Sequence, residues 1–130
     1  MDLNACIPKD KFDIDALELA GHVGFPKLNP VLPDLLTWVQ DANWPIAPQT
    51  ASLLSQAGSE ISPHIKAILN SDDAVWKYWT IDLVVRHLSP DVLVDLRDDL
   101  AKLANHPSQV DQMEGVDVVA KNILNRLEIT

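Results

Sequence analysis

The sequence has one cysteine and only four glycines among its 130 residues. A lone thiol, Cys6, can form no disulfide within the chain and cannot supply a cysteine-rich zinc site. This cysteine usage favours a reducing compartment, so we expect a cytoplasmic protein. The glycines do not have the spacing of a phosphate-binding loop, which argues against a nucleotide-binding enzyme of that kind.

Long hydrophobic runs and positive charge are also scarce. No stretch approaches the run of about 18 apolar residues that a membrane helix needs. Residues 1–20 hold seven charged side chains, so we expect no secretory signal there. The formal net charge is −9. Because nucleic acids and anionic membranes attract basic proteins, we expect neither as a direct partner, whereas a basic protein would be attracted.

Patterns typical of catalysis and metal binding are missing as well. No two histidines have the i, i+4 spacing of a helical metal pair, and no G-x-S-x-G motif marks a nucleophile. The acidic pairs Asp72-Asp73 and Asp98-Asp99 would point about 100° apart on a helix, so neither resembles a pair that shares a proton. We therefore expect no catalytic residue, no metal site and no cofactor.

What the sequence does contain is apolar residues at helical spacing almost throughout. One example is the seam formed by Leu93, Leu96, Leu100 and Leu103. No alternating segment is long enough for a β-strand, and the length suits one domain. The sequence predicts an all-α domain over residues 1–130 with about seven helices, which run roughly over 10–21, 30–42, 45–57, 62–71, 73–88, 90–105 and 115–128.

A short internal repeat suggests how these helices are arranged. The segment Asp41–Trp44 recurs as Asp73–Trp76, at an offset of 32 residues. A helix is predicted before each copy and another at or just after it, which is typical of stacked helical hairpins. We expect a first helix followed by hairpins over about 30–57, 62–88 and 90–128. The alternative is chance similarity over few positions.

The aromatic residues allow two interpretations. The predicted helix over 73–88 is apolar almost all round, so we expect it at the centre of the fold with Trp76 and Trp79 in the core. In the other interpretation the aromatic residues meet on an exposed surface, since Trp and Tyr are common anchors of protein interfaces. Lys77 lies between aromatic residues and would then reach a carboxylate of the partner.

An acidic pattern allows two interpretations as well. Asp91, Asp95 and Asp98 follow i, i+4 and i+7 spacing, opposite the leucine seam. They are either a solvated helix face or a docking surface for a basic partner.

The Trp-rich motifs resemble those of an uncharacterised bacterial family known only as a domain of unknown function. That family carries D-x-N-W-P followed by D-D-x-x-W-K-Y-W, with P-K-D-K-F near the start. The matching segments here are Asp41–Pro45, Asp72–Trp79, Pro8–Phe12, Pro63–Lys66 and Glu114–Asp117. The resemblance implies a HEAT-like curl of hairpins and no established activity. An immunity-type role is a further implication, because similar domains often lie beside bacterial toxin systems.

Two functions from different classes follow. The first is a non-enzymatic interaction module that binds another protein, with a basic protein favoured by the charge. Its expected contact residues are Trp44, Asp73, Trp76, Lys77, Asp91, Asp95 and Asp98. The alternative is a small hydrolase-like enzyme with a pocket among Trp44, Asp73 and Trp76.

Overall fold

The computed structural model describes the backbone of residues 2–129 and the side chains of residues 2–127. The all-helical prediction is confirmed, because no residue of that range lies in a β-strand. The α-helices are α1 (Ile14–Val23), α2 (Leu32–Leu36), α3 (Ala47–Leu54), α4 (Ser62–Leu69), α5 (Ala74–Trp79), α6 (Pro90–Asp95), α7 (Arg97–Asn105), α8 (Gln109–Glu114) and α9 (Val116–Ile129). None of the described helices combines the length and the apolar character needed to span a membrane.

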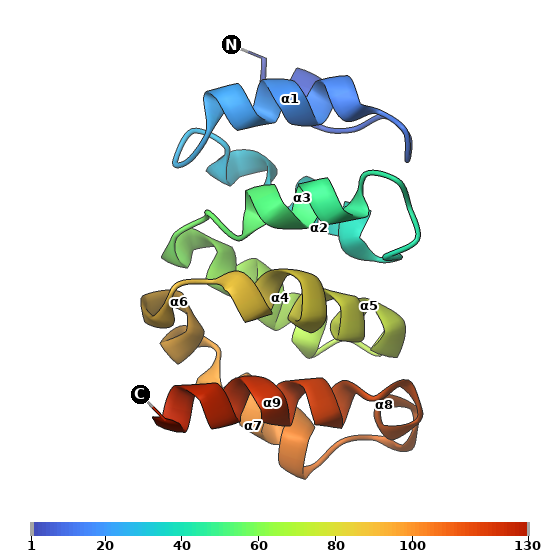
Figure 1. Cartoon of the computed structure of the whole chain (residues 1–130), viewed down its shortest axis with the longest axis vertical. Helices are drawn as coiled ribbons and strands as arrows, with labels where there is room; N and C mark the ends of the chain where they lie inside the picture. The colour runs from blue at the N-terminus through green and yellow to red at the C-terminus, as the bar shows by residue number, and fades with distance from the viewer. Residues whose placement is uncertain (1, 130) are drawn as a thin grey trace.

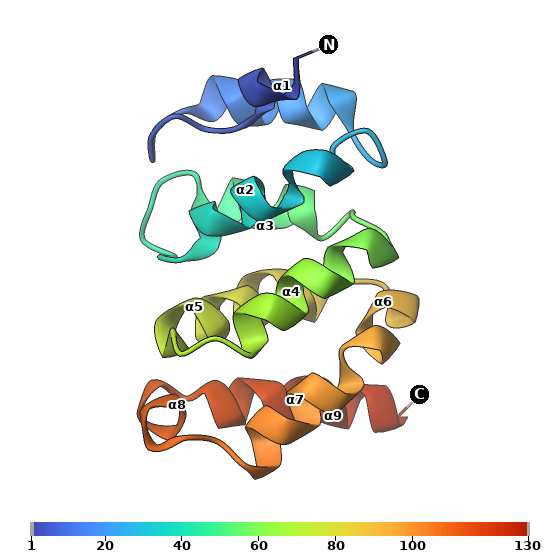
Figure 2. The same ribbon diagram turned by 180° about the vertical axis from the view of Figure 1, so that it is seen from behind.

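The helices form a stack of four layers (Figure 1). The first layer contains α1, the second α2 and α3, the third α4 and α5, and the fourth α7 and α9. Helix α6 leads into α7 at one edge of the stack, and α8 joins α7 to α9 at the other. The view from behind brings α2, α4 and α7 to the front (Figure 2). The second, third and fourth layers are therefore two rows of helices deep.

Local residues explain where several helices begin and end. Pro63 and Pro90 lie in the first turns of α4 and α6, where proline is favoured. Asp73 caps α5, because its Oδ1 accepts a hydrogen bond from the backbone N–H of Trp76 at 3.0 Å. Gly115 ends α8 with a φ of 79°, a left-handed conformation that glycine adopts without strain.

One apolar core runs through all four layers. The leucine seam over residues 93–103 faces this core, as the sequence predicted, and all four of its side chains are buried. Burial of such apolar surface is the main stabilising term of the fold. The largest fully buried side chains are Leu28, Leu32, Leu35, Leu36, Ile46, Leu54, Ile61, Ile65, Ile81, Leu96, Leu100 and Ile123.

The described residues form nine α-helices, so the prediction of about seven was slightly low. The predicted helix over 90–105 is broken at Leu96, where α6 ends before α7 begins. The backbone of Leu96 has φ −99° and ψ −2°, away from regular α-helical values. The predicted helix over 73–88 continues from α5 as a π-helical turn over Thr80–Val84 and a 3-10 turn over Val85–His87. No helix was predicted between those over 90–105 and 115–128, but α8 lies there.

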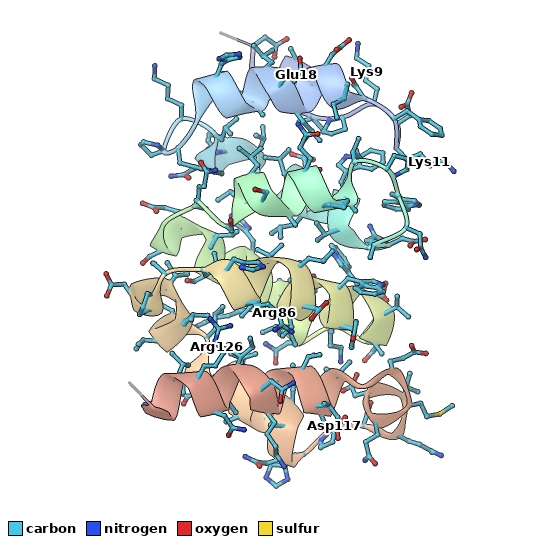
Figure 3. All side chains as sticks on the ribbon, viewed as in Figure 1. Lys9, Lys11, Glu18, Arg86, Asp117 and Arg126 are labelled. Carbon is cyan, nitrogen blue, oxygen red and sulfur yellow. The ribbon has the colours of Figure 1, made fainter. Side chains whose placement is uncertain are left out.

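Trp76 and Trp79 are half-buried, so the prediction that both are core residues was wrong. Trp76 packs at the border of the core, and its Nε1 donates to the carbonyl oxygen of Leu36 at 3.1 Å. The N–H of a buried indole usually needs a hydrogen-bond acceptor. At the border of the core the apolar part of the ring can pack while the N–H reaches such an acceptor. A second polar contact joins layers on the face seen in Figure 3, where Arg126 Nη1 donates to the carbonyl oxygen of Arg86 at 3.1 Å.

Cys6 is buried in the first layer, and we expect its thiol to react slowly in the native protein. Burial raises the pKa of the Cys6 thiol above its ordinary value, and the nearby Asp2 carboxylate raises it further. At a given pH less thiolate is then present, and the thiolate is the reactive form. Labelling with an aromatic disulfide reagent at pH 8 should be at least about tenfold slower in native than in unfolded protein. Equal rates would contradict the burial of Cys6.

Candidate functional site

The turns within the hairpins lie together at one edge of the stack, which we call the turn edge. It comprises segments 8–14, 40–46, 70–75 and 106–114, on the right in Figure 1 and on the left in Figure 2. Alternate helices of a hairpin stack run in opposite directions, so successive hairpins place their turns at the same edge. The turn edge thus gathers the Trp44 and Asp73 turns of the two repeated motifs.

Apolar side chains from several layers are exposed on the turn edge. Phe12 is 66% exposed beside the first layer, and Met113 is 76% exposed on α8 in the fourth. Trp44 is half-buried in the second layer, where its ring centroid lies 5.5 Å from that of Trp38. Isolated exposed apolar residues are normal, but several along one edge are typical of an interaction surface. The exposed apolar residues of the turn edge are Phe12, Ile14, Val75, Val110 and Met113.

The charged side chains of the turn edge are mixed near the first layer and acidic beyond it. Lys9 and Lys11 lie near the first layer (Figure 3), and Lys11 Nζ is 5.4 Å from the centroid of the Phe12 ring. Asp72, Asp73 and Glu114 are exposed in the third and fourth layers. This edge therefore combines apolar side chains with exposed carboxylates.

The structure separates the four predicted contact residues near the Trp-rich motifs. Trp44 and Asp73 lie on the turn edge, as a surface role requires. Trp76 turns toward the carbonyl oxygen of Leu36. Lys77 is only 6% exposed, so the prediction that it reaches a partner was wrong.

Lys77 is buried because α8 covers it and supplies its counter-charge. Its Nζ lies 3.0 Å from Oδ1 of Asp111, a residue that is 3% exposed. Sequence reasoning missed Asp111, which lay between two predicted helices. The available signal was Ser108 three residues before Asp111, because this spacing forms a capping box. Ser108 Oγ accepts a hydrogen bond from the Asp111 N–H at 3.1 Å and confirms this pattern.

Asp91, Asp95 and Asp98 are all exposed, but they do not form one continuous helix face. The break at Leu96 places Asp98 on α7 while the other two lie on α6. Helix α6 lies at the edge opposite the turn edge in both views (Figures 1 and 2). Asp95 is partly engaged, since its Oδ2 accepts a hydrogen bond from Ser62 Oγ at 3.0 Å. The predicted contact residues thus belong to two separate surfaces.

Trp76 lines a cavity of about 200 Å3, but Trp44 and Asp73 are not among the lining residues. The cavity lies between α2 and α4, and its lining residues are Pro33, Leu36, His64, Ala67, Ile68, Ser71 and Trp76. The sequence analysis expected a pocket among Trp44, Asp73 and Trp76. The cavity that Trp76 lines does not include the other two residues, so it is not that pocket. Within the described part of the chain, no group of three or more His, Cys, Asp or Glu residues is placed to hold a metal ion.

Comparison with known proteins identifies one family. The sequence model of a family described as "Domain of unknown function (DUF5071)" matches residues 6–124. The curated proteins include no match to this chain.

Proposed function

Because the chain belongs to the DUF5071 family, a domain of unknown function, we propose a function from its surface: a non-enzymatic module that binds another protein through the turn edge. The observation that carries this proposal is that exposed apolar residues belong to turns and helix ends of several layers, which lie along one edge (Figure 1). Aromatic residues and methionine are enriched at protein interfaces, and a few such residues supply most of the binding energy. A rigid stack would present them without an ordering step.

A basic partner suits this surface best. Asp72, Asp73 and Glu114 are exposed beside the apolar side chains, and the net charge of the chain is −9. Opposite charges on a partner would speed association and exclude acidic competitors. We place the interaction in the cytoplasm, since the only cysteine, Cys6, is a free thiol. A bacterial toxin would be one basic partner of the kind that an immunity-type role requires.

We expect Met113→Lys to weaken capture of a protein partner from the source cells by at least about tenfold, because it puts a charge into an apolar contact, and loss of one hot-spot contact costs about 2 kcal/mol or more. Met113 is 76% exposed, so the melting temperature should stay nearly unchanged. Val94→Lys is the matched control, because Val94 is also exposed, at 60%, and lies on α6 at the opposite edge. Quantitative pull-down with each variant would measure the difference.

Two outcomes would change the proposal. Capture that survives Met113→Lys but is lost in Asp95→Lys or Asp98→Lys would place binding on the α6–α7 surface. An on-rate independent of salt, at concentrations where the Debye length is about 10 Å or less, would argue against a basic partner.

A further inference from the structure

A polar cleft of about 260 Å3 lies between the third and fourth layers, at the turn edge. Its walls come from the end of α4, the turn before α5, α5 itself, α7, the turn before α8 and the first turn of α8. Pockets for drug-sized ligands typically measure about 300–1,000 Å3, so this cleft suits a smaller molecule. The lining residues are Leu69, Asn70, Ser71, Asp72, Lys77, Asp99, Lys102, Leu103, His106, Ser108 and Asp111.

The buried Lys77–Asp111 ion pair forms part of the cleft lining. Lys77 Nζ contacts both carboxylate oxygens of Asp111, at 3.0 and 3.2 Å. The Ser108 N–H also donates to Asp111, at 3.4 Å. An ammonium group has three N–H donors. Both contacts of the Lys77 ammonium go to one carboxylate, and within the described residues its third N–H has no other partner.

The remaining charged side chains of the cleft form no ion pair with a described residue, and they differ in hydrogen bonding. Asp99 accepts a hydrogen bond from Asn70 Nδ2 at 3.0 Å. The side chains of Asp72 and Lys102 form no hydrogen bond or ion pair with any described residue. The cleft therefore holds two carboxylates without a counter-charge, those of Asp72 and Asp99, and one such ammonium group, that of Lys102, beside a buried ammonium with a spare donor. An anion alone would leave Asp72 unmatched, and a cation alone would leave Lys102 unmatched.

We propose that this cleft binds a free α-amino acid through its zwitterionic head group. The ligand carboxylate accepts hydrogen bonds from Lys77 and Lys102, and the ligand ammonium donates to Asp72. Leu69 and Leu103 give the cleft an apolar wall, which favours a small aliphatic side chain. This inference is independent of the partner-binding proposal, because it depends only on residues that line the cleft.

The test is a titration of the 15N-labelled protein with L-alanine and L-valine, followed by NMR. We expect saturable shifts confined to the amides of residues 69–77 and 99–111. N-acetyl-L-alanine lacks the ammonium and L-alanine amide lacks the carboxylate, so each should bind at least about tenfold more weakly than L-alanine. The absence of saturable shifts with both amino acids would overturn the proposal, and equal binding of the acetylated compound would overturn the zwitterion assignment.

Two exposed residues allow the site to be tested without damage to the fold. Lys102→Gln and Asp72→Asn should each weaken L-alanine binding by about tenfold or more while the melting temperature stays nearly constant. Lys66→Gln and Asp98→Asn are the matched controls, because both residues are exposed and neither lines the cleft. Unchanged affinity in Lys102→Gln and Asp72→Asn would overturn the assigned contacts.

Discussion

Asp111→Ala is expected to lower the free energy of unfolding by about 3–5 kcal/mol, because it leaves the Lys77 ammonium buried without a counter-charge. Lys77 and Asp111 are 6% and 3% exposed, so water from the adjoining cleft can replace only part of the interaction that the carboxylate makes. The substitution also removes the carboxylate that accepts from the Ser108 N–H. Urea unfolding, followed by circular dichroism, would measure the loss.

Two further variants separate the effect of burial from that of charge. In Lys77→Met/Asp111→Leu no charge is stranded, so the double variant should recover most of the loss. Asp82→Ala breaks the ion pair with Arg86, whose side chains are 26% and 36% exposed, and should lose only about 0–1 kcal/mol. A loss below about 1 kcal/mol in Asp111→Ala would mean that water reaches the Lys77–Asp111 pair in solution.

The second large effect is expected at Ile81, which is fully buried in the π-helical turn. Ile81→Ala should destabilise the protein by about 2–5 kcal/mol, because it removes buried methyl groups and leaves a cavity. Thermal and urea unfolding would give the difference. Val94→Ala, at a side chain that is 60% exposed, should change stability by about 0.5 kcal/mol or less. Similar losses in the two variants would contradict the central position of the π-helical turn.

Much of the fold could be predicted from periodicity, because a helix that buries one stripe must repeat apolar residues at helical spacing. The leucine seam was predicted in this way, whereas the hairpin arrangement was inferred from the repeat of Asp41–Trp44 as Asp73–Trp76. Helix α8 was missed because it is short and mostly polar, so it has almost no apolar period. The break at Leu96 was missed for a different reason: no proline or glycine marks it, and the apolar spacing continues through it, with Leu93, Leu96 and Leu100 all buried.

The candidate site was harder to predict than the fold. Asp73 could be placed, because an aspartate just before an apolar run is a common helix cap. The burial of Lys77 could not be predicted, because its partner Asp111 lies 34 residues away on a helix that the pattern did not show. The turn edge could not be predicted either, because it forms only when the layers stack. Phe12 and Met113 are far apart in sequence and share an edge only because the layers place their turns in register.

The order of the layers also affects how the chain folds. The helix pairs with the most extensive packing belong to one layer or to layers that follow each other in the chain, and the two ends of the chain lie at opposite ends of the stack (Figure 1). No early step therefore requires distant parts of the chain to meet, and the entropy lost in closing each loop stays small. Proteins with such short sequence separations between contacting residues fold in roughly microseconds to milliseconds. The stack can thus bury its apolar surface soon after synthesis, which shortens the time during which exposed apolar surface could cause aggregation.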